Sequence, residues 1–134
     1  MDQLFFETKS KYGFDETVQK LSEIASGSGW KLIHVHDLQE TMRKNGKEVL
    51  PVKVIEICKP DYAYRLLSED DQRVYSNMMP CRVSVYEKED GQTYLSRINS
   101  ALMASQIGGV VQEVMTAAFA DAEQFIEKVK ISIA

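Results

Sequence analysis

The sequence predicts an α+β fold: a single two-layer domain in which helices pack on one face of a mostly antiparallel sheet. Segments with strand or helix periodicity occur in the order strand, helix, strand, strand, short helix, hairpin, long helix. Asp90-Gly91 separates two of the strand-like segments, which is a strong hairpin signal. The chain has 134 residues, 44% of them apolar and 27% charged, which suits one core over residues 1–134.

The chain begins with a predicted strand and a predicted amphipathic helix. Residues 4–9 are rich in aromatic and β-prone side chains and predict the strand. Asp15 suits an N-cap, and Gly27 and Gly29 suit the end of the helix. The apolar stripe at helical spacing consists of Phe14, Val18, Leu21, Ile24 and Ala25.

A second strand and a polar connection follow. Residues 30–37 alternate with a period of two, which predicts a strand. One face would carry Ile33 and Val35, and the other Leu32, His34 and His36. Residues 39–50 are polar and contain the turn signal Asn45-Gly46, so they predict a mobile connection with one helical turn at its start.

The middle of the chain predicts a strand, a short helix and a hairpin. Residues 52–58 form the strand, and Pro60 opens a helix that ends near residues 70–71. Residues 82–89 and 92–99 flank Asp90-Gly91, which predicts a two-residue turn with both residues at positive φ. The alternation directs Cys81, Val83 and Val85 to the core and Ser84 and Tyr86 to the opposite face.

The longest predicted helix runs from residue 110 to about 131, after Gly108-Gly109. Its apolar seam is Val111, Met115, Ala118, Ala122, Phe125 and Val129, and a second row is Phe119, Ile126 and Ile133. Two rows make a wider apolar face than one small sheet needs, which favours a subunit contact. The uncovered sheet face, where Leu32, Tyr86 and Tyr94 are expected, also favours a homodimer.

The charge and hydropathy patterns exclude several classes of partner. The net charge is −4 with dispersed Lys and Arg, which argues against nucleic-acid binding. No apolar run reaches the length of about 18 residues that a membrane span needs. The N-terminal segment lacks the pattern of a secretory signal, so we expect a cytoplasmic protein whose two cysteines remain thiols.

Three segments together resemble the domain of unknown function 302 family. They are Glu56-Ile57-Cys58-Lys59-Pro60, Leu66-Leu67, and Met79-Pro80-Cys81-Arg82-Val83-Ser84-Val85-Tyr86-Glu87. His36-Asp37-Leu38 and the closing helix also fit, so the resemblance covers nearly the whole chain. It implies a fold like half of the TATA-binding protein, β-α-β-β-β-β-α, commonly dimeric and with no assigned activity. Function belongs to sites, so the fold likeness does not imply DNA binding.

The two cysteines form the first candidate site. Cys58 ends one predicted strand and Cys81 begins the next, so their thiols would lie near each other if these strands pair antiparallel. The helix that starts after Cys58 would favour a thiolate there, which suits a redox pair or half of a soft-metal site. The alternative is that both cysteines are small buried apolar residues, which the absence of a Cys-x-x-Cys motif favours.

The two histidines form the second candidate. His34 and His36 share one strand face, and Glu56 could supply a third metal ligand. Two histidines on a solvated strand face explain the same spacing without a metal, and the absence of a second tight ligand pair favours this alternative. The combined hypothesis places His36, Glu56, Cys58 and Cys81 in one thiol or soft-metal site.

The sequence thus predicts a small dimeric binding or accessory domain in a bacterial-type cytoplasm. A small-molecule or metal ligand fits this prediction, and no nucleic-acid or membrane partner is expected. The sequence specifies no cofactor and no nucleophilic catalytic set. The alternative function is a thiol-dependent redox or metal-binding protein that uses Cys58 and Cys81.

Overall fold

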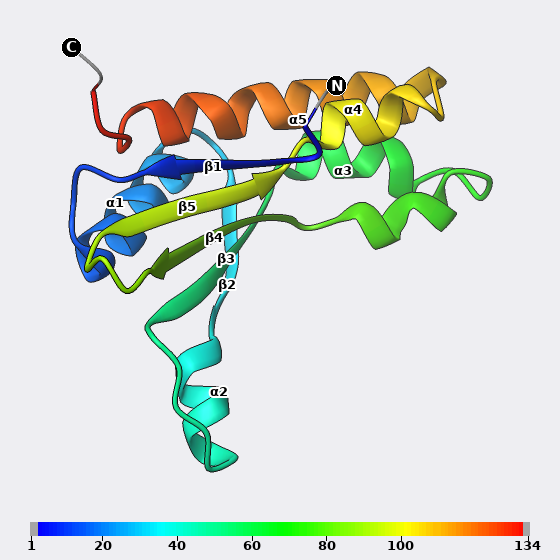
Figure 1. Cartoon of the computed structure of the whole chain (residues 1–134). Helices are drawn as coiled ribbons and strands as arrows, with labels where there is room; N and C mark the ends of the chain where they lie inside the picture. The colour runs from blue at the N-terminus through cyan, green and yellow to red at the C-terminus, as the bar shows by residue number, and fades with distance from the viewer. Residues whose placement is uncertain (1–2, 133–134) are drawn as a thin grey trace.

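A computed structural model describes residues 3–132 and confirms the α+β fold class (Figure 1). Its five-stranded sheet has the order β1-β5-β4-β3-β2, and all four pairings are antiparallel. The strands are β1 (Phe5–Lys9), β2 (Lys31–Asp37), β3 (Val52–Cys58), β4 (Cys81–Glu87) and β5 (Thr93–Ile98).

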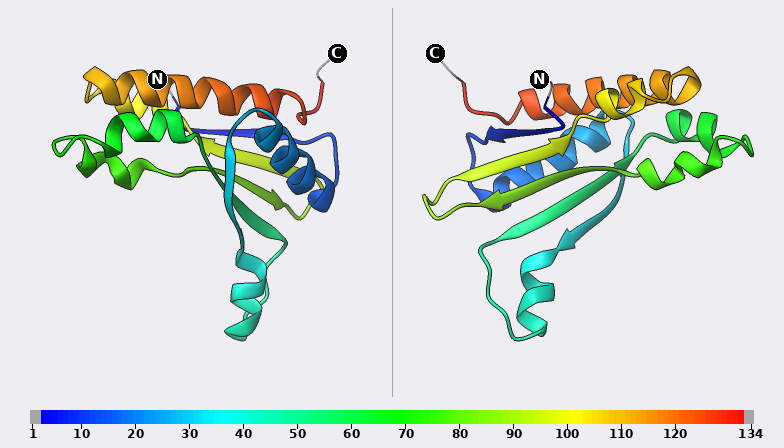
Figure 2. Two further views of the ribbon diagram at one scale, coloured as in Figure 1. Left: turned by 180° about the vertical axis from the view of Figure 1, so that it is seen from behind. Right: turned by 45° about the vertical axis from the view of Figure 1, so that its right-hand side comes forward.

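The helices that pack on the sheet lie on one of its faces. They are α1 (Phe14–Gly27), α3 (Pro60–Leu67), α4 (Ser100–Ser105) and α5 (Gly109–Glu127), with the 3-10 helix η1 (Arg73–Met78) after α3. Figure 2 shows α1 and α5 on the same side of the strands. The remaining helix, α2 (Leu38–Lys44), projects from the far ends of β2 and β3, away from the other helices (Figures 1 and 2).

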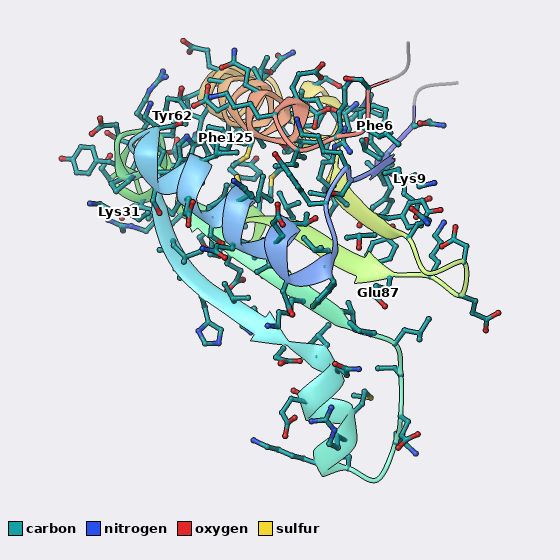
Figure 3. The ribbon with its side chains drawn as sticks, turned by 90° about the vertical axis from the view of Figure 1, so that its left-hand side faces the viewer. Phe6, Lys9, Lys31, Tyr62, Glu87 and Phe125 are labelled. Carbon is teal, nitrogen blue, oxygen red and sulfur yellow. The ribbon has the colours of Figure 1, made fainter. Side chains whose placement is uncertain are left out.

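The core lies between α5, α1 and the sheet. The predicted seam of α5 is buried at every position: Val111, Met115, Ala118, Ala122, Phe125 and Val129. Trp30 packs edge-on against Phe125, and Phe6 packs against Phe119, each with ring centroids 5.9 Å apart. Figure 3 shows Phe6 and Phe125 on the side of the sheet that faces α5. Of the predicted second row, Ile126 is buried, Phe119 is partly buried, and Ile133 lies outside the described residues.

Both long helices differ from prediction at one end. The N-cap of α1 is Gly13, and Asp15 lies in the first turn without capping. The reason is a buried hydroxyl pair: Thr17 Oγ1 donates to the Gly13 carbonyl at 2.7 Å and lies 2.6 Å from Ser10 Oγ. The helix α5 ends at Glu127, before the predicted end, because the chain there turns to pair with the end of β1. The Ile131 amide donates to the Lys9 carbonyl at 2.8 Å.

Two connections differ from those that the sequence predicted. In place of a mobile segment, α2 forms, and the Asp37 carboxylate caps it by accepting from the Glu40 amide at 3.0 Å. The two-residue hairpin turn was a wrong prediction. Residues 88–92 connect the strands, and only Gly91 has a positive φ, because Asp90 instead accepts from the Gln92 amide at 2.8 Å.

A bulge in β2 changes the predicted faces of that strand. Leu32 is opposite Ile57, whereas His34 is opposite Glu56, so the register shifts between Leu32 and His34. Alternation alone predicted that Leu32 shares a face with His34 and His36, and the bulge removes Leu32 from that face. Bulges are common on edge strands such as β2, because an edge strand has a sheet partner on one side only.

The opposite face of the sheet, here called the open face, has no helix packed on it within residues 3–132. Tyr86 and Tyr94 lie there as predicted, opposite each other on β4 and β5 with stacked rings 6.3 Å apart. None of the helices within residues 3–132 combines the length and apolar character needed to cross a membrane.

Candidate functional site

The side chains of His36, Glu56 and Arg82, from three neighbouring strands, meet on the open face. Glu56 of β3 contacts His36 Nε2 at 2.7 Å through one carboxylate oxygen and accepts from Arg82 Nε at 2.9 Å through the other. The hydrogen bond with His36 is the main cause that lowers the pKa of Glu56, and the bond from Arg82 lowers it further against the opposing effect of burial. Glu56 is therefore ionised at neutral pH and bound on both sides.

The second histidine packs against the first. The rings of His34 and His36 lie 4.5 Å apart, centroid to centroid, at an angle of 68°. Residues 3–132 contain no group of three or more His, Cys, Asp or Glu side chains placed to hold a metal ion. The two histidine rings thus contact each other, and Glu56 is hydrogen-bonded to His36 and Arg82.

The cysteines do not join this group. Cys81 is opposite Ile57 in the β3–β4 register and packs against the core on the helix side, whereas Glu56 and His36 lie on the open face. Cys58 ends β3 and is partly buried. The predicted convergence of four side chains is therefore corrected: strand alternation puts Cys81 on the opposite side of the sheet from Glu56.

The two cysteines are nevertheless neighbours, as the antiparallel pairing of their strands implied. Both thiols are free, and both border a small apolar hollow of about 20 Å³ beside Trp30 and Tyr62. Burial raises the pKa of Cys58, and burial together with the nearby Cys58 raises the pKa of Cys81 to about 11. Both groups are therefore protonated thiols at neutral pH, not nucleophilic thiolates.

A larger apolar cavity forms because the two central strands diverge. β4 pairs with β3 along Cys81 to Tyr86, but it pairs with β5 only from Ser84 to Glu87. Beyond that point β5 continues beside β1 and leads into α4, while the start of β4 turns away toward η1 (Figure 1). The helix α5 borders the divergence through Ala118, Phe119 and Ala122.

The cavity at this divergence has a volume of about 220 Å³. Its apolar wall includes Met78, Cys81, Ile98, Met103, Phe119 and Ala122, from η1, both strands, α4 and α5. Its polar groups are Asn77, Arg82, Arg97 and Ser100. An apolar cavity of about 150 Å³ accepts benzene, so this volume suits one ring with a short substituent.

The two arginines of the cavity differ in how many of their donors are occupied. Arg97 has a side chain only 9% exposed, donates twice to Glu123 at 2.6 and 2.7 Å, and donates once more to Thr8. Arg82 is 54% exposed, and within residues 3–132 it donates to another side chain only through Nε, to Glu56. The guanidinium of Arg82 is therefore the one with donors left for a ligand.

A larger hollow lies elsewhere, between β1 and the end of α5. It measures about 540 Å³, and charged side chains such as Glu7, Lys9, Glu127 and Lys130 dominate its wall. Ligand sites are usually apolar with a few polar groups. We therefore regard the smaller cavity at the strand divergence as the better candidate.

Sequence reasoning chose Cys81 as a candidate site residue and placed Phe119 and Ala122 on the apolar face of the long helix, but it did not predict the cavity that they border. The missing element was α4, which has only six residues and no apolar periodicity. One signal could have revealed it: the Asn99 side chain caps the helix by accepting from the Leu102 amide at 3.1 Å. Asn99-Ser100 after a strand is a helix-start pattern.

Comparisons with known proteins agree with this fold. The crystal structure of an uncharacterised conserved DUF302 protein from Bacillus stearothermophilus superimposes with a TM-score of 0.85, at 18% sequence identity. The match covers 96% of this chain and 100% of that one, and at this identity it shows a shared fold. No curated protein matches the sequence.

The family assignment rests on the sequence itself. The family model described as domain of unknown function DUF302 matches residues 6–132. The matched range contains every strand from Phe6 of β1 onward and all the helices, including those around the cavity. The chain therefore belongs to the DUF302 family.

Proposed function

We propose that this protein is a non-catalytic binding domain that holds a small, largely apolar molecule between β4, β5, α4 and α5. The observation that carries the proposal is the divergence of two central strands with a mostly apolar cavity of about 220 Å³ behind it. The cavity opens to solvent beside Ile98, Met103 and Arg82, so a ligand can enter it, and mostly apolar walls with a few polar groups are typical of ligand sites.

The thiol-dependent alternative has weaker support. A redox or metal role needs a thiolate, and the pKa of each cysteine is raised by burial. Cys81 instead contributes a small apolar surface to the cavity wall. We expect slow reaction of both thiols with a disulfide reagent in the native protein at pH 7. Fast reaction of either thiol would restore the redox hypothesis.

Filling the cavity tests the binding proposal. Ala122 borders the cavity from α5, so Ala122→Leu places three further carbon atoms in it. Ala120 is exposed on the same helix, and Ala120→Leu is the matched control. Benzyl alcohol, titrated into each protein and followed by backbone amide chemical shifts, should bind saturably to the wild type and to Ala120→Leu.

The proposal expects the Ala122→Leu protein to remain folded and to lose this binding. Extra carbon atoms are tolerated where space exists, whereas overpacking a full core costs about 1–3 kcal/mol. Equal binding by Ala122→Leu, or no saturable binding by the wild type, would contradict the proposal.

We also propose that two copies of the chain associate through the open face. Phe5 and Ile98 are opposite each other on β1 and β5, and they are 61% and 41% exposed. Both side chains point to the open face, because their neighbours Phe6 and Arg97 contact α5 on the other side. Exposed apolar side chains of this size on an uncovered sheet face favour an interface.

The two free thiols support a reducing compartment such as the cytoplasm.

A further inference from the structure

We infer that the cavity ligand is a one-ring carboxylic acid whose carboxylate is bound by Arg82. This inference rests on the proposed binding function and adds the chemical class of the ligand. It depends on three features of the cavity: the position and free donors of Arg82, the small apolar volume next to it, and the charge of Glu56.

The first feature is a guanidinium at the border of an otherwise apolar cavity. Arg82 lies on the open-face side of β4, borders the cavity, and is half exposed. Its Nε is held by Glu56 at 2.9 Å, which fixes the side chain and leaves its two terminal nitrogens without a side-chain partner within residues 3–132. A guanidinium held in this way is prepared to donate to a carboxylate, which accepts paired hydrogen bonds.

Arg97 cannot bind the carboxylate of the ligand. Its Nε and both terminal nitrogens donate to Glu123 and Thr8, and its side chain is almost fully buried. Its charge is therefore neutralised within the wall. The other polar groups at the cavity, Asn77 and Ser100, are neutral and can only supplement the arginine.

The second feature limits the body of the ligand. A volume of about 220 Å³ lies below the range of about 300–1,000 Å³ typical of sites for drug-sized molecules. It exceeds the cavity of about 150 Å³ that accepts benzene. A single ring with a short acidic arm fits within this space, whereas a long acyl chain would extend beyond it.

The third feature limits the charge of the ligand to one. The Glu56 carboxylate lies against Arg82 and already offsets part of its positive charge. A dianion such as a phosphate monoester would place a second negative charge close to Glu56, which is unfavourable. A carboxylate carries a single charge and gains both free donors.

Phenylacetate and phenylacetamide test the inference, because they share one ring and differ in charge. Each is titrated into the wild type, Arg82→Gln and Arg65→Gln by isothermal calorimetry at low ionic strength. Arg65 is the matched control, since it is a half-exposed arginine paired with Glu113 at 3.2 Å, away from this cavity. We expect the wild type to bind the acid about tenfold more tightly than the amide, as for one charged hydrogen-bond pair.

Arg82→Gln should lose most of this preference while its affinity for the amide stays unchanged, and Arg65→Gln should behave as the wild type does. Equal affinity of the wild type for acid and amide would overturn the inference and leave the proposed function standing. Binding of neither compound would overturn both. The comparison of acid and amide in the wild type does not depend on the variants. It therefore tests the inference even if the Arg82→Gln protein does not fold.

Discussion

Glu123 shows how one residue supports both the fold and the cavity wall. It receives two hydrogen bonds from Arg97, whose guanidinium is nearly buried between β5 and α5. A buried charge without a partner costs several kcal/mol, whereas an exposed ion pair contributes little. An exposed ion pair follows one turn later, between Glu127 at the end of α5 and Lys130 beyond it.

Glu123→Ala should therefore lower the free energy of unfolding by about 3 kcal/mol, because Arg97 would remain buried without its carboxylate. Glu127→Ala should change it by less than about 0.5 kcal/mol. Urea denaturation followed by circular dichroism measures both values. Similar losses in the two variants would show that the Arg97 pair is not the buried contact described here.

Glu56 gives a pH prediction. Its pKa in the folded protein is lowered by His36 and Arg82, whereas an unfolded glutamate titrates near about 4.3. The ionised carboxylate thus contributes stability above about pH 4.3, and this contribution is lost as the pH falls through the lower folded value.

The difference in free energy of unfolding between the wild type and Glu56→Gln should accordingly shrink as the pH is lowered from 6 to 3. Glu48→Gln, in the exposed segment after α2, is the control and should track the wild type throughout. Denaturation curves collected at each pH supply the comparison. A Glu56→Gln difference that stays constant over this range would contradict the lowered pKa.

Helices and strands differ in how well the sequence predicted them. The long apolar periodicities of α1 and α5 identified both helices, and only their ends were misplaced, where the Thr17 hydroxyl and the pairing of Ile131 with Lys9 act. Alternation placed Val83 and Val85 in the core correctly. It failed in β2, because a bulge is set by sheet partners that local sequence does not reveal.

The stability of the short helix α4 depends on its N-cap, Asn99. Asn99 accepts from the Leu102 amide, and no apolar periodicity supports the six residues that follow. Asn99→Ala should lower the free energy of unfolding by about 1 kcal/mol, as for other N-cap losses. Thermal denaturation checks this value. Asn45→Ala, at the C-cap of the projecting α2, is the control and should be nearly neutral.

A loss in Asn99→Ala no larger than that in Asn45→Ala would mean that packing alone holds α4.

The candidate site could not be predicted, because it depends on how strands that are distant in sequence are arranged. The strand register brings His36, Glu56 and Arg82 together, and the alternation of residues in the sequence can suggest such a contact. The cavity, in contrast, exists because β4 and β5 separate. That separation is a tertiary property, and it also explains why Cys81 borders a cavity.

At the scale of the whole molecule, one covered face and one open face make a homodimer the expected assembly. Light scattering after size exclusion should give twice the chain mass of 15.2 kDa. Phe5→Glu should shift the mass toward the monomer, because it places a charge on the exposed apolar part of the open face. Val74→Glu, at an exposed apolar position on η1, is the control and should leave the mass unchanged. A monomeric wild type would contradict the dimer.

The claim that the strand divergence holds a small molecule is tested most directly by locating one there. Nuclear Overhauser effects between the ring protons of benzyl alcohol and protein methyl groups report contacts in solution. The account predicts contacts to the methyl groups of Met103 and Ala122, which border the cavity from α4 and α5. Contacts confined to exposed methyl groups such as those of Val74, or no contacts at all, would contradict it.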